Sequence, residues 1–195
     1  MLTLTVSISL CLLFTKPLDL QIQDTLHQEL EWSSRKLTFA DFHLNDNIRG
    51  PEAAYISGKI NYSIITEKTP SSLTSLNLRV KNIIDPNNTW IRNKHLGDTA
   101  ILSHEQGHFD LAEVYSRKFI ASAGATPFSK NYKTELKKIY DSIHIELTQA
   151  QVNYDKETHH GLNIASQKKW LIYIKEALKS LDMYKTKFIH LKLNH

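Results

Sequence analysis

Cysteine is almost absent from this 195-residue chain. Its one cysteine, Cys11, lies inside an apolar run from Leu2 to Phe14, and a single cysteine cannot form an intramolecular disulfide. The fold must therefore depend on its apolar core, and on any bound metal, for its stability. Internal repeats and low-complexity tracts are missing too. The length suits one domain with enough residues to bury a real core.

No apolar run in the sequence is long enough to span a bilayer. The run from Leu2 to Phe14 falls short of the roughly 20 apolar residues that a transmembrane helix needs. Its length is typical of the hydrophobic part of a secretory signal, although no Lys or Arg precedes it. A buried first strand is the alternative. We expect residues 1–18 to be a signal peptide and the mature protein to be exported, periplasmic or extracellular, without a membrane span.

Blocks of like charge are also missing. Lys and Arg exceed Asp and Glu by 24 to 20, and these charges are spread along amphipathic segments. Such a distribution is typical of solvated faces rather than of a nucleic-acid surface, so we expect no nucleic-acid partner. No pattern in the sequence indicates a particular oligomeric state.

The clearest chemical signal is an H-E-x-x-H pattern, in which His104 and His108 enclose Glu105. Apolar residues at helical spacing, without proline from Thr99 to Ala125, predict a long helix across it. Residues four apart lie one turn above each other, so both imidazoles can bind one metal ion, which we expect to be Zn²⁺. Glu105 lies beside them and can act as a general base. The alternative is a half-buried helix face that carries two histidines by chance.

Two segments before the motif have the period of β-strands. Apolar residues alternate from Ile56 to Ile64 and again from Leu76 to Val80, with a connector at residues 68–72 between them. These patterns predict a small antiparallel sheet ahead of the motif helix. An edge strand of such a sheet could hold an extended peptide beside the metal by main-chain hydrogen bonds.

Two further long helices are predicted after the motif. Apolar residues recur at helical spacing from Ser129 to Asp155 and from Asn163 to Tyr184. The sequence therefore indicates an α+β fold, with a small N-terminal antiparallel sheet followed by long helices and the H-E-x-x-H on the first of these. We expect residues 19–184 to form a single domain and residues 185–195 to be a C-terminal tail.

The metal needs a third protein ligand, which must come from outside the motif helix. One zinc-protease pattern has a histidine six residues after the second histidine, but Val114 stands at that distance from His108. Glu113 falls on the far side of the helix. Glu135 and Glu146, on the second predicted helix, are better explained as solvent-facing residues.

The richest source of a third ligand is the segment Tyr154–Gly161. His160 is the first choice, because a turn at Gly161 can direct its side chain away from the helix into a cleft. Glu157 and Asp155 are the next candidates, and if either is the ligand, His160 becomes a donor to the oxyanion. An exposed polar loop is the alternative reading of this segment.

Four segments between residues 30 and 184 share a recognisable pattern. They are Leu37–Phe42, with Phe39 where a Trp is expected, His104–Asp110, the Tyr154–Gly161 segment, and Gln167-x-x-Trp170. Together they resemble the bacterial domain-of-unknown-function family 922, which is placed among the zincin-type metallopeptidases. The resemblance implies a zincin-like fold and a zinc-dependent, exported peptidase.

The resemblance also implies roles for individual residues: His104 and His108 as zinc ligands, Glu105 as the catalytic residue, and His160 as a further site residue, assigned here as the third ligand. We therefore predict a zinc metallopeptidase that hydrolyses peptide or protein substrates with a zinc-bound water. Glu105 takes the proton of that water and passes it to the leaving amine.

A donor for the oxyanion is needed as well, either Tyr154 or whichever of Glu157 and His160 is not a ligand. Two other functions remain open at this point. One is a zinc-dependent hydrolase of a non-peptide amide or cross-bridge of the cell envelope. The other is a non-catalytic envelope protein in which the metal is structural.

Overall fold

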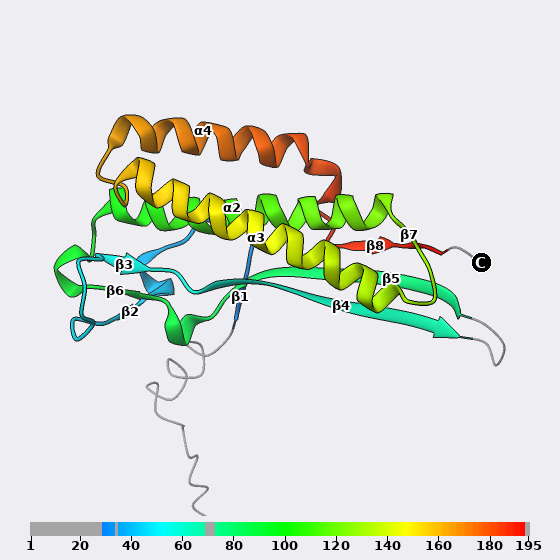
Figure 1. Ribbon diagram of the computed structural model, residues 1–195. Helices are drawn as coiled ribbons and strands as arrows, with labels where there is room; N and C mark the ends of the chain where they lie inside the picture. The colour runs from blue at the N-terminus through cyan, green and yellow to red at the C-terminus, as the bar shows by residue number, and fades with distance from the viewer. Residues whose placement is uncertain (1–28, 34, 69–72, 194–195) are drawn as a thin grey trace, which may run out of the picture.

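The computed structural model describes residues 29–33, 35–68 and 73–193 (Figure 1). The signal peptide predicted at residues 1–18 lies outside these ranges. The α+β class is confirmed, with long helices packed against an antiparallel sheet. Within the described ranges, no helix combines the length and the apolarity needed to cross a bilayer.

A long hairpin forms the main sheet. β4 (Gly58–Lys68) and β5 (Leu73–Ile84) pair antiparallel, and β1 (Leu30–Glu31) and β8 (Phe188–His190) both pair antiparallel with β5. The alternating apolar residues predicted this hairpin, because successive side chains of a strand point to opposite faces. β8 comes from the segment predicted to be a tail, so this sheet joins residues from both ends of the described chain.

Three long helices cover the sheet. α2 (Thr99–Ala125) lies next to the strands, α3 (Tyr132–Thr158) crosses in front of it, and α4 (Ile164–Ser180) lies farthest from the sheet (Figure 1). The motif residues His104 and His108 both lie on α2. Since α2 contacts the sheet and both other helices, its side chains together meet residues from most of the fold.

The ends of the later helices differ from the pattern in the sequence. α3 starts at Tyr132 rather than at Ser129, because the backbone N–H of Ser129 donates to the Glu135 side chain at 2.9 Å, before the first turn. α4 ends earlier than predicted, and Asp182–Tyr184 tighten into a 3₁₀ turn. Apolar spacing continues across both boundaries, so hydrophobic periodicity alone predicted each helix to extend about one turn beyond its observed end.

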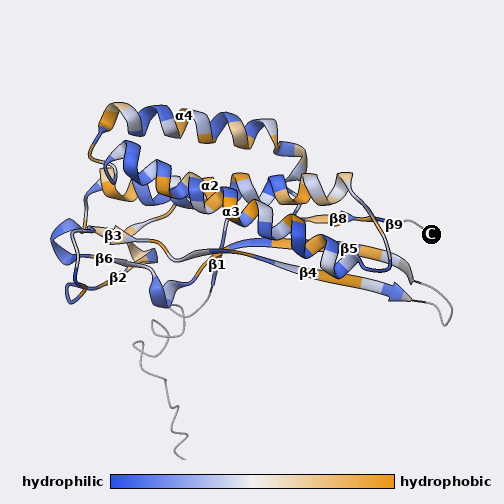
Figure 2. Ribbon diagram, in the orientation of Figure 1, coloured by the Kyte–Doolittle hydropathy of each residue, from blue (hydrophilic) through white to orange (hydrophobic). Residues whose placement is uncertain are grey.

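Two groups of buried apolar side chains form the core. One lies between the main sheet and the helices, and the other lies under the first turns of α2. Polar and apolar residues alternate along α3 and α4 (Figure 2), as expected for helices with one face in the core and one in solvent. The first group includes Leu76, Leu78, Val80, Phe119 and Leu136, and the second includes Leu37, Phe42, Ile84, Ile91 and Phe109.

A second, smaller sheet lies near the first turns of α2. Its central strand β6 (Trp90–Ile91) pairs parallel with β2 (His43–Leu44) and antiparallel with β3 (Ala54–Tyr55). Among the described strands, β3 is therefore an edge strand. Near the C-terminus, β7 (Pro127–Phe128) and β9 (Lys192–Leu193) form a short parallel pair.

A buried charge cluster fastens the C-terminal segment to α2. Glu113 is fully buried and accepts a hydrogen bond from Arg117 Nε at 2.8 Å. The Lys187 ammonium contacts the same carboxylate and lies 3.3 Å from Ser116 Oγ. Burial lowers the pKa of Lys187 below its usual value, although the Glu113 charge opposes this shift. Residues beyond the predicted domain end at 184 are thus packed into the fold.

Candidate metal centre

α2 brings the two motif histidines together. The helix begins after Asp98, whose side chain accepts hydrogen bonds from the backbone N–H groups of Ala100 and Ile101 at 3.0 and 3.4 Å. From this start, His104 and His108 fall on one face, and their Nε2 atoms lie 3.1 Å apart. Two imidazoles on successive turns of a regular helix thus present one nitrogen each to the same point.

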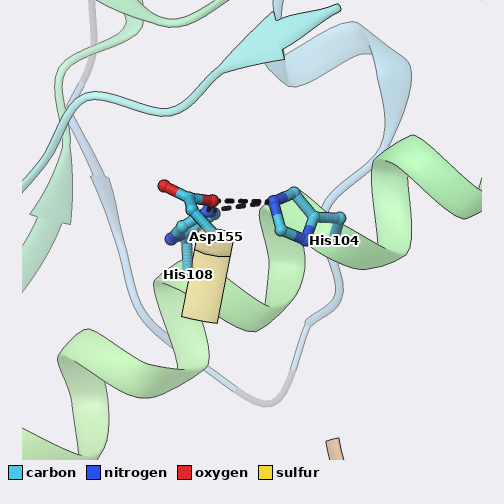
Figure 3. A group of neighbouring side chains, drawn as sticks. All are labelled: His104, His108 and Asp155. Atoms are coloured by element: carbon cyan, nitrogen blue, oxygen red, sulfur yellow. Dashed lines mark hydrogen bonds and ion pairs between the residues drawn. The ribbon is translucent and has the colours of Figure 1, made fainter. Parts of the chain in front are cut away.

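α3 supplies the third group, the carboxylate of Asp155. Its Oδ1 lies 3.1 Å from His104 Nε2 and 2.8 Å from His108 Nε2 (Figure 3). Zinc–ligand bonds of 2.0–2.2 Å in a tetrahedral site place neighbouring ligand atoms about 3.3 Å apart. The three atoms therefore have nearly the spacing that one small cation requires, and this group could hold a metal ion.

Asp155 is ionised in this setting. Burial alone would raise the pKa of the Asp155 carboxyl, but the hydrogen bonds and charges of His104 and His108 outweigh it and hold that pKa well below its usual value. The same contact raises the pKa of His108, against the effect of its burial. One negative oxygen and two imidazole nitrogens are a donor set that suits zinc and related divalent ions.

Glu105 lines the same cavity as the two histidines. It is only 5% exposed, and burial raises the pKa of its carboxyl, while the nearby His108 and His104 oppose that shift. Among the described residues, no hydrogen bond or ion pair engages the Glu105 carboxylate. A buried carboxylate that is free of partners and raised in basicity can accept a proton from a neighbouring group.

The chain leaves α3 through an unusual turn that positions His160. His159, His160 and Gly161 have consecutive positive φ values of 50°, 53° and 84°. Positive φ costs on the order of 1–3 kcal/mol at each non-glycine residue, and such strain is concentrated at functional sites. A Cβ atom on Gly161 would lie 3.1 Å from His104 Cβ, so the turn packs directly against the first histidine.

His160, predicted as the third ligand, lies in the cavity but outside the group of three converging atoms. Its Nδ1 is 3.5 Å from Asp155 Oδ1, and its side chain is 66% exposed. Glu157 points elsewhere, accepting a hydrogen bond from Trp170 Nε1 at 2.9 Å. Of the three candidates in this segment, the structure brings Asp155 against the histidine pair.

The remaining carboxylates considered from the sequence lie away from the centre. Glu113 is buried in the charge cluster with Arg117 and Lys187. Glu135 is bonded to Ser129 at the start of α3, and Glu146 is exposed. The interpretation of these three residues as non-ligands agrees with their positions.

Gly107 has a packing role inside the motif. A Cβ atom at this position would lie 2.1 Å from Tyr154 Oη, so only glycine lets the tyrosine ring pack against α2 here. Tyr154 is fully buried, and its hydroxyl donates to the carbonyl oxygen of His104 at 3.2 Å. The hydroxyl is thus buried between α2 and α3 beside both histidine rings, and it does not line the cavity as an oxyanion donor.

Two glutamines that the sequence analysis gave no role contact the histidines. Gln151 Oε1 is hydrogen-bonded to His108 Nδ1, and Gln167 Oε1 lies 3.2 Å from His104 Nδ1. Gln151 is four residues before Asp155 on α3, a helical spacing that would have placed it on the metal-facing side. Gln167 lies on a different helix, and the signal available for it was its place in the Gln167-x-x-Trp170 segment of the family resemblance.

The cavity in front of these residues has a volume of about 490 Å³. Its polar end is formed by the two histidines, Glu105 and Asp155. Its walls come from residues 52–59 and from α2 and α3. They are mostly apolar, with Ile56, Phe109, Ala112 and Leu147 among them, and they also carry Glu52 and Lys59. A molecule in the cavity would therefore meet the metal-binding groups at one end and mostly apolar surface elsewhere.

Comparison with known protein families gives a match over most of the chain. Residues 38–161 match a family described as "Bacterial protein of unknown function (DUF922)", a span that includes all of α2 and α3 but not α4. No curated protein and no solved structure matches the chain. The matched span covers well over half of the sequence and contains all three residues of the candidate metal centre. The chain therefore belongs to the DUF922 family of bacterial proteins of unknown function.

Proposed function

We propose that this protein is a zinc-dependent metallopeptidase with a zincin-like arrangement of its H-E-x-x-H helix. The observation that carries the proposal is the convergence of His104 Nε2, His108 Nε2 and Asp155 Oδ1 within about 3 Å. An unpartnered buried carboxylate, Glu105, faces the same cavity. A structural metal site is usually closed by four protein ligands, whereas three ligands beside a cavity are typical of a catalytic site.

A zinc ion bound by these three residues would supply Lewis acidity for a water molecule and for the scissile carbonyl. Glu105 is placed to take the proton of the attacking water, since burial raises its carboxyl pKa and favours the protonated form. It can then deliver that proton to the leaving nitrogen. His160, exposed at the cavity beside Asp155, is positioned to donate a hydrogen bond to the developing oxyanion.

The substrate that we propose is a peptide or protein segment in extended form. The edge strand β3 borders the cavity through Ala54 and Tyr55, and an edge strand can pair with an added chain. The apolar walls suit uncharged side chains of such a segment. With the signal peptide predicted at residues 1–18, we place this activity outside the cytoplasm.

The test is metal content and peptide hydrolysis of Glu105→Gln beside wild type. We expect stoichiometric zinc in both proteins, and a loss of turnover of roughly 10²–10⁴-fold in the variant, because only the proton acceptor changes. Glu157→Gln, a change at an exposed carboxylate two residues after Asp155, is the matched control and should cleave normally.

Substrates for this test are a mixture of peptides of varied sequence, with and without a chelator. Normal cleavage by Glu105→Gln, or a wild type that holds no zinc when zinc is offered, would exclude the proposal. Cleavage of non-peptide amides alone, abolished by the chelator, would assign the centre to an envelope amide hydrolase instead.

A further inference from the structure

We propose that Gln151, Gln167 and Tyr154 are positioning residues that fix the orientation and tautomer of both histidines. Each network that they form starts at the backbone carbonyl of the histidine that it orients. The inference deepens the proposed function and rests on the same metal centre. Its basis is the direction of the hydrogen bonds. This direction is fixed because the backbone carbonyl oxygens of the two histidines can only accept.

At His108 the direction follows from two contacts of one amide. Gln151 Nε2 donates to the backbone carbonyl oxygen of His108 at 3.1 Å. A carbonyl oxygen only accepts, so the NH₂ end of the amide must face it. The other end, Oε1, then faces His108 Nδ1 and can only accept. Nδ1 therefore carries a proton, and Nε2, which faces Asp155 Oδ1, is left as the nitrogen that would bind the metal.

At His104 the same argument includes one more group, the Tyr154 hydroxyl. The Tyr154 hydroxyl has a single proton, which it donates to the backbone carbonyl oxygen of His104 at 3.2 Å. It must therefore accept the hydrogen bond from Gln167 Nε2 at 2.7 Å. Gln167 Oε1 then faces His104 Nδ1 at 3.2 Å as an acceptor. His104 Nδ1 therefore carries a proton as well, and its Nε2 is left as the nitrogen that would bind the metal.

A ring in the other tautomer would place an N–H where the metal must bind. Orienting partners of metal-bound histidines are most often carboxylates or carbonyl oxygens, and losing one typically weakens metal binding 10–100-fold. Here both partners are neutral amides, so the orientation adds no negative charge to the centre. Of the groups that hold or orient the ligands, only Asp155 then offsets the positive charge of a bound ion, and the rest of that charge is available to a substrate.

α4 becomes part of the centre through this arrangement. Gln167 lies on α4, after the span that matches the family, yet it contacts His104 as directly as Gln151 contacts His108. Both glutamines are at least half-buried beside the histidines, and Gln167 is 7% exposed. Their role is to hold the rings rather than to touch a substrate.

The experiment measures zinc affinity of the full chain by competition with a chromophoric chelator. Gln151→Met and Gln167→Met keep side-chain length but lose the acceptor, and each should weaken zinc binding about 10–100-fold. Gln149→Met is the matched control, because Gln149 is exposed on the same helix and, within the described part of the chain, its side chain bonds to Asn153 alone. It should bind zinc within about twofold of wild type, and Gln151→Glu, which restores an acceptor, should recover most of the lost affinity.

Tyr154→Phe tests the relay to His104 with a different change. Without the hydroxyl, Gln167 loses the group that sets its direction, so zinc affinity should fall as in Gln167→Met. The control is Tyr140→Phe, which removes another part-buried hydroxyl bonded to a carbonyl, that of Ile60 at 2.9 Å. That control should leave zinc affinity unchanged.

Nitrogen-15 NMR of the imidazoles in metal-free protein gives a readout that does not depend on zinc. We expect protonated Nδ1 at both histidines of the wild type, and loss of that signal only at His108 in Gln151→Met and only at His104 in Gln167→Met. Wild-type zinc affinity and unchanged Nδ1 signals in both variants would overturn the inference while leaving the metallopeptidase intact. A wild type with the expected Nδ1 signals but no zinc binding would sustain the inference and exclude the proposed function.

Discussion

His104 Nε2 and His108 Nε2 are only 3.1 Å apart, a distance at which two nitrogen lone pairs repel each other. In the metal-free protein, a proton shared with Asp155 relieves this repulsion, as the raised pKa of His108 indicates. A divalent cation relieves it more strongly, because it accepts both lone pairs and the carboxylate charge together. The close approach of the three side chains is thus less favourable without a cation than with one bound.

The third ligand can be identified by removing the side chain of each of its two candidates in turn. Asp155→Ala removes an oxygen that contacts both Nε2 atoms, so we expect zinc affinity to fall by at least about 100-fold, more than loss of an orienting partner costs. His160→Ala should keep zinc but slow hydrolysis roughly 10²–10³-fold, the cost of losing an oxyanion donor. Metal analysis and peptide cleavage of both variants check this, and zinc lost only with His160→Ala would restore His160 as the ligand.

At the scale of single elements, α2 carries a glycine that packing requires and another that it does not. Gly107 faces Tyr154, whereas the Cβ of a residue at position 124 would lie 3.3 Å from the flexible end of Ile189. Alanine is favoured over glycine inside helices by about 1 kcal/mol. The two positions should therefore respond oppositely to the same substitution.

Gly107→Ala should destabilise the protein by about 1–3 kcal/mol, because the added methyl group overlaps the buried Tyr154 ring. Gly124→Ala, near the end of the same helix, should be neutral or stabilising by less than about 1 kcal/mol. Urea unfolding of both variants measures the difference. Equal effects of the two substitutions would show that Tyr154 moves freely and that the close packing at Gly107 is not required.

The motif helix α2 and the hairpin strand β5 illustrate what the sequence could predict. The period-two pattern of Leu76, Leu78 and Val80 identified β5, and the proline-free helical pattern identified α2, because both are local properties of the chain. The pairing of β8 with β5 joins residues more than 100 positions apart and leaves no local trace. Similarly, the choice between Asp155 and His160 depends on how α3 crosses α2 and on three positive φ angles, neither of which a one-dimensional pattern encodes.

On the scale of the whole molecule, the C-terminal segment closes the fold through β8 and through Lys187. Glu113 is fully buried, and breaking a buried ion pair from one side is strongly destabilising. Arg117 would remain as one partner of that carboxylate. The segment therefore stabilises the fold through strand β8 and through the contact of Lys187 with the buried Glu113 carboxylate.

Removing residues 185–195 should lower the free energy of unfolding by more than about 3 kcal/mol, since it deletes β8 and the Lys187 contact together. Lys187→Met alone should cost about 1–3 kcal/mol. Lys185→Met is the control, because Lys185 forms only an exposed pair with Asp182 and should change stability by less than about 0.5 kcal/mol. Thermal unfolding of the three variants beside wild type measures these changes. An unchanged free energy of unfolding in the truncated protein would show that the segment is dispensable.

Synthesis of the chain gives the position of β8 a further meaning. Ribosomes make a protein from its N-terminus, and domains begin to fold as they emerge. Here the middle of β5, at residues 77–79, has no partner on one side until residues 188–190 exist. The sheet thus stays incomplete until the ribosome has made residues 188–190, more than 100 positions after the part of β5 that they cover.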